Sequence, residues 1–136
     1  MTTFRISEAA ALLGVSADTV RRWVDTGRLA AQRDEHGHRR VDGQDLAAFA
    51  RGQIEDETGS GHSSARNRFR GIVTEVIKDA VMAQVEIAAG PYRVVSLMSR
   101  QAADELGLEP GVVAVAVIKS TNVVVETPDS TRAVSQ

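Results

Sequence analysis

Eleven residues near the middle of the chain separate two halves whose apolar residues repeat with different periods. This segment, Gln53 to Ser63, reads QIEDETGSGHS and has no periodic apolar positions. Its acids, Gly and Ser are typical of a flexible linker, and no Gly-Lys-Ser/Thr follows its Gly residues as in a phosphate-binding loop. Apolar spacing is helical before the segment and alternates as in strands from Phe69 onward. We therefore expect two small domains within 136 residues.

Composition and charge exclude several classes of protein. Cysteine is absent, which excludes disulfides, thiolate zinc sites and cysteine nucleophiles. The net charge is +1 for residues 1–52 and −3 for residues 53–136, so a nucleic-acid surface must be a local patch on the first half. No Ser/His/Asp or Glu/His grouping forms a catalytic motif, so we expect no enzyme.

The location also follows from the apolar pattern. The longest apolar run, Val112 to Ile118, is far shorter than the roughly 20 residues that span a bilayer. Glu8 precedes only a short Ala/Leu run, unlike the basic region of a signal peptide. We therefore expect a cytoplasmic protein with no membrane partner.

The first half begins with two closely spaced helices. Ser7 is the expected N-cap of a helix that ends at Gly14. Ser16 is the expected N-cap of the next, with Asp18 complementing its positive end. The turn between them is short enough for a helix-turn-helix. Trp23 shares the apolar stripe of the second helix, so its Arg pair faces outward.

A hairpin and a third helix complete this half. The stretch from Leu29 to Val41 alternates weakly around a polar turn, residues 34–37, and carries arginines on both arms. Asp42 is the expected cap of a helix that ends near Gly52. We call the hairpin over residues 29–41 the wing. His36 and His38 could suggest a metal site, but no third ligand is near, and we interpret them as surface residues of the wing.

The sequence SEAAALLGVSADTVRRWVDTGRL, followed by GHRRV and DLAAF, resembles the winged helix-turn-helix of the MerR and excisionase type. The resemblance implies a major-groove position for the second helix and backbone contacts for the wing. An outward Arg pair also occurs in many domains simply because a solvent face is polar. Double-stranded DNA is the expected partner, and the implied contacts are Ser16, Thr19, Arg21 and Arg22 in the groove and Arg39 and Arg40 at phosphates.

The second half predicts a small barrel. Strands are expected around residues 72–77, 81–87, 92–98, 112–118 and 123–126, with a helix over residues 99–106. Five short strands with a helix after the third fit a barrel of the OB type. Because the strand over 112–118 is apolar at every position, both of its faces need cover, which other copies would supply.

The segments SARNRF, LMSRQAADELGLEPG and AVIKSTNVVVE resemble the Mop or TOBE module of molbindins and molybdate-responsive regulators. The resemblance implies a homo-oligomer, a hexamer or a dimer, that binds molybdate or tungstate at its interfaces, with no organic cofactor and no direct metal ligation. Ala102 stands where the family usually has a second hydroxyl. The implied oxyanion ligands are Ser64, the backbone of Ala65, Arg66, Asn67, Ser99, Lys119 and Ser120.

Each of these residues also has a simpler interpretation. Ser99 is a good helix cap without any ligand. Arg66 belongs to an alternating set of arginines that could protect a strand edge by charge. Lys119 could be a solvated lysine at a strand end. Together, however, they supply the N–H and O–H donors and positive charge that offset the lost hydration of a dianion.

The sequence thus predicts an α+β protein with an N-terminal winged helix-turn-helix (1–52), a linker (53–63), a five-stranded OB-like barrel with one short helix (64–127) and a disordered tail (128–136). The predicted function is a transcription regulator that senses molybdate or tungstate. A molbindin-like store of the oxyanion and a DNA-binding protein that uses the barrel only to oligomerise remain as alternatives.

Overall fold

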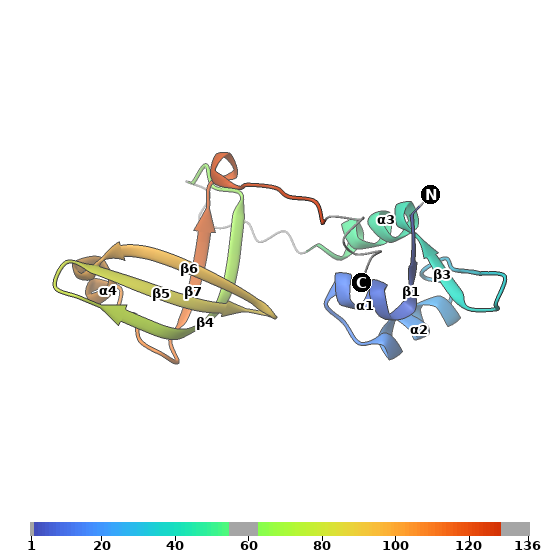
Figure 1. Cartoon of the computed structure of the whole chain (residues 1–136), viewed down its shortest axis with the longest axis horizontal. Coiled ribbons are helices and arrows are strands. Elements are labelled where there is room, and N and C mark those ends of the chain that lie inside the picture. The colour runs from blue at the N-terminus through green and yellow to red at the C-terminus, as the bar shows by residue number, and fades with distance from the viewer. Residues whose placement is uncertain (1, 55–62, 129–136) are drawn as a thin grey trace. The chain divides into compact units, whose positions relative to one another are not determined.

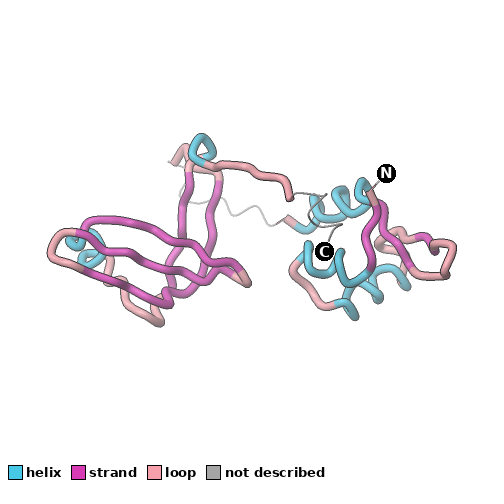
Figure 2. Tube along the Cα trace, viewed as in Figure 1, coloured by secondary structure: helices cyan, strands magenta, loops and turns pink. Residues whose placement is uncertain are grey.

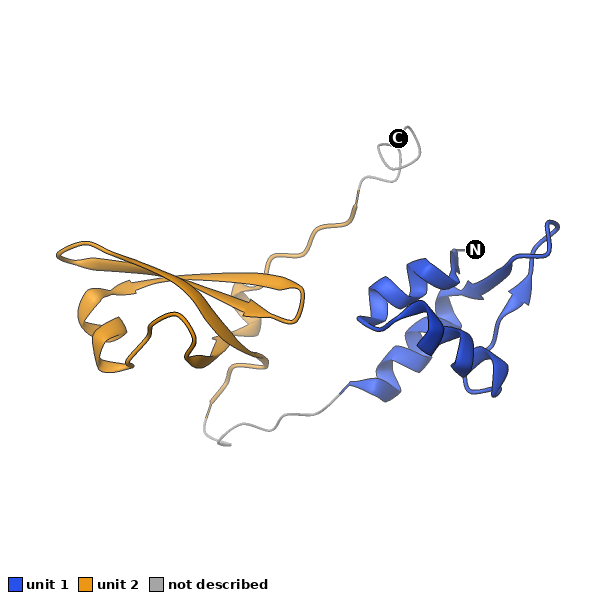
Figure 3. Ribbon diagram, turned by 90° about the horizontal axis from the view of Figure 1, so that it is seen from below, with its two compact units in different colours: residues 1–56 blue, residues 57–136 orange. Residues whose placement is uncertain are grey.

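The computed structural model describes residues 2–54 and 63–128. It divides into two compact units, residues 1–56 and 57–136 (Figure 3). Each unit is considered by itself. The expected linker lies mostly, and the expected tail almost wholly, outside the described residues.

Unit 1 contains the predicted helices and hairpin and one strand that the sequence did not indicate. That strand, β1, pairs with β3, and β2 pairs with the other side of β3, so the sheet order is β1-β3-β2 (Figure 1). The winged helix-turn-helix is confirmed. In chain order the elements are β1 (Thr3–Arg5), α1 (Ile6–Leu13), α2 (Ala17–Asp25), β2 (Gln32–Arg33), β3 (Arg39–Asp42) and α3 (Gly43–Gln53).

Most helix ends follow the predicted chemistry, with one correction. The Ser16 hydroxyl accepts a hydrogen bond from the Thr19 backbone N–H at 3.1 Å, as an N-cap should. Gly14 ends α1 in the left-handed conformation at φ 71°. The prediction of Ser7 as a cap is wrong, because β1 leads directly into α1 and the cap position is Arg5, whose N–H donates to Glu8 Oε1 at 2.8 Å.

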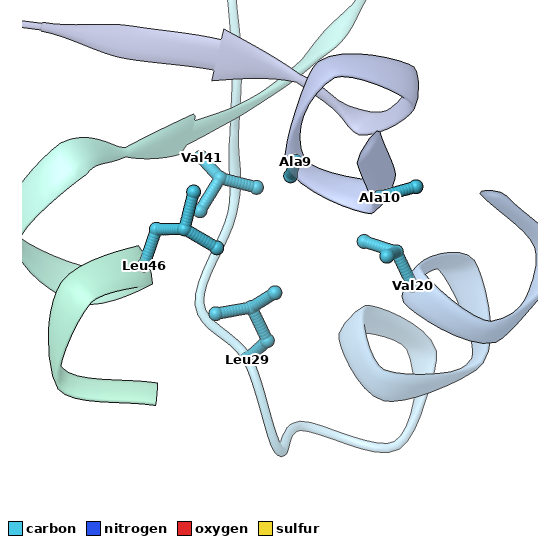
Figure 4. Close-up of a cluster of buried hydrophobic side chains, with 6 residues drawn as sticks. All are labelled: Ala9, Ala10, Val20, Leu29, Val41 and Leu46. Atoms are coloured by element: carbon cyan, nitrogen blue, oxygen red, sulfur yellow. The ribbon is translucent and has the colours of Figure 1, made fainter. Parts of the chain in front are cut away.

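The core of unit 1 joins its helices to its sheet. Figure 4 shows side chains from α1, α2, β3, α3 and the loop after α2 that converge on one cluster. Trp23 packs against this cluster, and the centroids of the Trp23 and Phe49 rings are 4.8 Å apart. This packing leaves the opposite side of α2 polar and exposed. The buried members are Ala9, Ala10, Val20, Leu29, Val41 and Leu46.

Unit 2 is a curled four-stranded antiparallel sheet in the order β6-β5-β4-β7, with one α-helix (Figure 2). Helices plus sheets confirm the predicted α+β class. The strand β4 is longer than the sequence pattern indicated. The elements are β4 (Asn67–Lys78), β5 (Met82–Ala89), β6 (Tyr92–Ser99), α4 (Arg100–Glu105), β7 (Val113–Ile118) and the 3-10 turn η1 (Ser120–Asn122).

The prediction of a fifth strand over residues 123–126 is wrong for the single chain. After β7 the turn η1 redirects the backbone, and residues 123–128 have no strand assignment. The side chains of Val124 and Val125 are 86% and 82% exposed. Their apolar, β-branched character produced the strand prediction, but the described part of the chain offers this segment no neighbouring strand.

Gly71 lets two strands approach closely inside the curled sheet. A Cβ placed on it would lie 2.3 Å from the Ala88 carbonyl oxygen and 2.8 Å from Ile87 Cγ2. No side chain fits at those distances. Next to it the register between β4 and β5 shifts between Val73 and Glu75, which marks a bulge of the kind that bends strands.

Candidate functional site

Pairing between β4 and β7 brings two of the predicted oxyanion-binding segments together. Asn67 lies opposite Ile118 in the ladder, and its Nδ2 donates to the Ile118 carbonyl at 3.0 Å. Lys119 and Ser120 follow Ile118 directly, and Figure 1 shows the start of β4 beside the end of β7. Segments some fifty residues apart in the sequence thus share one end of the sheet.

The backbone at this end is rich in N–H donors. Lys119 is the cap residue of η1, and the N–H groups of Asn122 and Val123 donate to the carbonyls of Lys119 and Ser120. The first N–H groups of such a turn have no partner within it, so those of Ser120 and Thr121 remain available to an anion. This turn was not predicted from the sequence, although the run Ser-Thr-Asn is typical of one.

The loop before β4 is held by its own hydrogen bonds. The Ala65 N–H donates to Ser63 Oγ at 3.1 Å, and Arg66 Nη1 donates to the Ser63 carbonyl at 3.3 Å. Ser63 was not among the predicted residues. Arg68 and Arg70 lie on the part of β4 that pairs with β7 but not with β5, so the charged-edge interpretation of these arginines stays open beside the oxyanion site.

Lys119 provides positive charge at this end. It is exposed and forms no ion pair with any described residue. Lysine presents a compact point charge that suits one vertex of a tetrahedral anion. An exposed cation beside free N–H groups and the Ser120 hydroxyl is suited to bind a small oxyanion.

Ser99 lies at the other end of the sheet. Ser99 pairs with Met82, the first residue of β5. The next residue of β5, Ala83, pairs with Lys78, which is the last residue of β4, whereas Asn67 is the first. Most of the length of β4 therefore separates Ser99 from Asn67 within one copy. The structure brings Asn67 of the SARN segment to the strand end that the Lys-Ser pair follows, whereas Ser99 lies at the other end.

Ser99 also has a structural role where it lies. Its hydroxyl accepts from the Ala102 N–H at 3.1 Å, as the N-cap of α4. The nearby cations are engaged: Lys78 Nζ contacts Asp104 at 2.6 Å and Arg100 Nε contacts it at 3.7 Å. The hydrogen bond from Lys78 holds the pKa of the Asp104 carboxyl below its usual value.

Unit 2 also contains an apolar hollow of about 410 Å³. Its walls come from β5, β6 and β7 and from Leu106 and Leu108, and Ser96 is its one polar residue. It lies against β6 and β7, which are the two edges of the sheet. Its lining does not suit a dianion, whose charge needs polar partners.

In unit 1 the exposed side of α2 carries the residues predicted to enter the DNA groove. Ser16 Oγ and Thr19 Oγ1 are 2.9 Å apart at its start. Arg21 and Arg22 are exposed, and Arg21 Nη1 contacts Asp18 at 2.7 Å. Arg22 forms no ion pair with a described residue.

The two wing arginines have partners within unit 1. Arg39 Nη2 lies 2.8 Å from Asp25 of α2, and the Arg40 guanidinium donates to Thr3 Oγ1 from Nε and Nη2 at 3.2 and 3.1 Å. These contacts tie β3 to α2 and to β1. Arg39 and Arg40, expected from the resemblance to contact phosphates, thus also fix the position of the wing within unit 1.

The tip of the wing is organised by a carboxylate. Asp34 Oδ1 accepts from the backbone N–H groups of His36 and His38, both at 2.9 Å. These donors, with that of His38 first, lower the pKa of the Asp34 carboxyl.

The described ranges, 2–54 and 63–128, contain no group of three His, Cys, Asp or Glu that could hold a metal ion. Within the same ranges, no helix is long and apolar enough to cross a membrane.

Comparison with known proteins divides the chain at the same place. Residues 63–125 match the TOBE domain family, and residues 3–54 match a helix-turn-helix domain family. The chain is 44% identical over 64 residues to molybdenum-pterin-binding protein 3 of Clostridium pasteurianum, covering 46% of this chain and 93% of that protein. Protein 1 of that name and organism is 38% identical over 63 residues with the same coverage. The solved structure of a molybdate binding protein from Sporomusa ovata is 28% identical, with a TM-score of 0.46, over 48% of this chain and 97% of that chain.

Proposed function

Because the chain belongs to the TOBE-domain family of the molybdenum-pterin-binding proteins and carries a helix-turn-helix domain before it, we propose that it is a DNA-binding transcription regulator that senses molybdate or tungstate. The chemistry is binding rather than catalysis, and we place it in the cytoplasm. The effector is the intact oxyanion, held by hydrogen bonds and charge.

The arrangement at the paired ends of β4 and β7 carries this proposal. Asn67 is fixed against Ile118, and Lys119 and Ser120 follow at once. A desolvated dianion needs several N–H and O–H donors and at least one positive charge. In the proposed site these come from Lys119, the Ser120 hydroxyl, the η1 backbone and the loop that contains Ser64, Ala65 and Arg66.

We infer that a second copy completes the site with Ser99. In one copy Ser99 lies at the far end of the sheet, so only the Ser99 of another subunit can reach Lys119. In that arrangement the hydroxyl caps α4 and also faces the anion. Ala102 supplies no further hydroxyl, so this contribution to the site is limited to Ser99 and backbone groups.

Exposed apolar side chains on the outer face of unit 2 support an oligomer, which we propose contains two or six copies. Val113, Val115 and Val117 of β7 are 54%, 38% and 46% exposed, and Leu97 of β6 is 66% exposed. Burying apolar surface stabilises an assembly by about 25 cal/mol per Å². The exposed apolar segment that includes Val124 adds to the surface that another copy would cover.

For the DNA-binding unit, we propose that α2 enters the major groove. Its exposed side would place Ser16, Thr19, Arg21 and Arg22 at base edges, where arginine bidentate to guanine is the commonest specific contact. The wing, with Arg39 and Arg40, would lie along the backbone. Phosphate contacts there fix the register of the domain on the duplex.

We expect the ligand to act through assembly. The composition of residues 53–63 predicts a flexible linker, which transmits torque poorly. An oxyanion held between copies would instead stabilise the oligomer and thereby change how many DNA-binding domains are linked. Linking such domains raises their effective concentration at paired sites and hence their joint affinity.

The experiment compares DNA binding with and without the ligand. The DNA probe is a duplex selected from a random pool by binding to the full chain. Fluorescence anisotropy then measures the affinity of the protein for this duplex with and without saturating molybdate. A molybdate-dependent affinity supports the regulator. Equal affinities, with molybdate bound, would favour the storage protein, and DNA binding without molybdate binding would favour a barrel used only for assembly.

A further inference from the structure

Unit 1 has a basic hollow next to the proposed DNA contacts, and two of its arginines, Arg5 and Arg33, are not among those contacts. It measures about 470 Å³ and lies between the start of α1, α2 and the wing. Four arginines line it: Arg5, Arg21, Arg33 and Arg39. Asp25 is the one carboxylate among its lining residues. Such an excess of positive charge at one concave site attracts an anion.

Two of these arginines are already neutralised. Arg39 is paired with Asp25 at 2.8 Å, and Arg21 with Asp18 at 2.7 Å. The uncompensated charge therefore comes from Arg5 and Arg33. Both side chains are exposed, and neither forms an ion pair with a described residue.

The backbone favours an anion at the same place. Ile6 and Ser7, the first residues of α1, line the hollow. The first N–H groups of a helix have no partner within it, and they carry the positive end of its dipole. Glu8, in the first turn of α1, accepts from the Arg5 N–H and offsets part of this charge. Arg33 Nη1 donates to the Gly37 carbonyl at 2.5 Å, which holds the guanidinium against the wing turn. The Arg33 charge is thus positioned in advance of any ligand.

We propose that this hollow receives a backbone phosphate of duplex DNA, held by Arg5 and Arg33. The inference rests on the proposed DNA binding and adds residues to it. A guanidinium suits a phosphate because it donates two parallel hydrogen bonds. Arg21 lines the hollow and also lies on the exposed side of α2, so the phosphate would flank the groove that α2 enters. Arg39, besides its proposed place along the DNA backbone, holds the wing to α2 through Asp25.

Phosphate contacts have a signature that base contacts lack. Each neutralised phosphate contributes about 0.9 to the slope of log K against log salt on B-DNA, whatever the sequence. The full-length chain is therefore titrated against two unrelated duplexes over a range of salt. For Arg5→Ala/Arg33→Ala we expect a slope smaller by about 0.9 and the same fold-loss of affinity on both duplexes.

Two control variants make the result specific. Arg51→Ala removes one exposed charge from α3, away from the hollow, and should leave the slope unchanged. Arg5→Lys/Arg33→Lys keeps both charges and should retain most of the slope. Thermal unfolding shows that each variant is folded. A small decrease is expected for Arg5→Ala/Arg33→Ala, which loses the hydrogen bond from Arg33 to the Gly37 carbonyl, and none for Arg51→Ala.

The failures are distinguishable. An unchanged slope for Arg5→Ala/Arg33→Ala, or an equal loss for Arg51→Ala, would overturn the phosphate site while leaving DNA binding intact. If the unchanged protein bound no duplex at any salt, both the phosphate site and the proposed function would be overturned.

Discussion

Substitution of Gly71 by alanine should strongly destabilise unit 2. The new Cβ would lie 2.3 Å from the Ala88 carbonyl oxygen, 2.8 Å from Ile87 Cγ2 and 2.9 Å from the Ala88 carbonyl carbon. Two of these atoms belong to the backbone, so no side-chain rotation relieves the clash. The strands β4 and β5 must separate where Ile72 pairs with Ala88.

The cost follows from two effects. Overpacking of this kind costs about 1–3 kcal/mol, and loss of one ladder hydrogen bond costs about 1 kcal/mol more. We therefore expect a loss of about 2–4 kcal/mol. At roughly 0.05–0.15 kcal/mol per residue, a unit of this size is stable by only about 3–10 kcal/mol, so the loss is a large fraction.

The assay is urea unfolding of the full chain at one fixed protein concentration. Circular dichroism follows the sheet of unit 2, and fluorescence of Trp23, the one tryptophan, follows unit 1. Gly52→Ala is the matched control, because a Cβ on Gly52 meets nothing within 4 Å and alanine favours the helix α3, by up to about 1 kcal/mol. The same substitution should thus have opposite signs in the two units. A Gly71→Ala protein within about 0.5 kcal/mol of the unchanged one would refute the steric argument.

Three further predictions concern caps and charge. Ser16→Ala removes the acceptor for the Thr19 N–H and should lower the stability of unit 1 by about 1 kcal/mol in urea unfolding followed by intrinsic fluorescence; no change would contradict the capping role. The pKa of the Asp34 carboxyl, measured by NMR titration, should lie below its ordinary value of 3.8, because the His38 N–H donates to the anion. The stability that this hydrogen bond contributes is present above pH 3.8 and is lost as the pH falls through the lowered pKa. A pKa at or above 3.8 would contradict the prediction. Lys119→Gln should weaken molybdate binding at least about tenfold in calorimetry, since a hydrogen bond to a charged group contributes about 1.5–3 kcal/mol, whereas equal affinity would remove Lys119 from the site.

Local chemistry explains what the sequence could predict. Ser16, Gly14 and Asp42 act within one turn of the chain, so their cap and turn roles are readable without a fold. The alternating strands of unit 2 were predictable for the same reason. The cap of α1 was misplaced because β1, three residues long, gives too short a pattern to identify before the helix.

The features that could not be predicted from the sequence depend on contacts between residues far apart in the chain or in different copies. The apolar segment around Val124 has strand character, but whether it pairs depends on a neighbour that the described part of the chain does not supply. The family resemblance placed Ser99 and Lys119 in one site, whereas the strand register puts them at opposite ends of one copy. No pattern of spacing in the sequence shows that separation. The basic hollow was likewise hidden, because Arg5 and Arg33 belong to β1 and β2, which are brought to the two sides of β3 only in the folded sheet.

Calorimetric titration of the purified full chain with molybdate, tungstate and sulfate, together with its native mass, tests whether the protein binds an oxyanion at a site shared between copies. We expect tight binding of molybdate or tungstate, little heat with sulfate, and an oligomer in which each site joins two copies. A monomer that binds molybdate tightly would contradict the shared site, and no heat with any of the three anions would contradict oxyanion sensing itself.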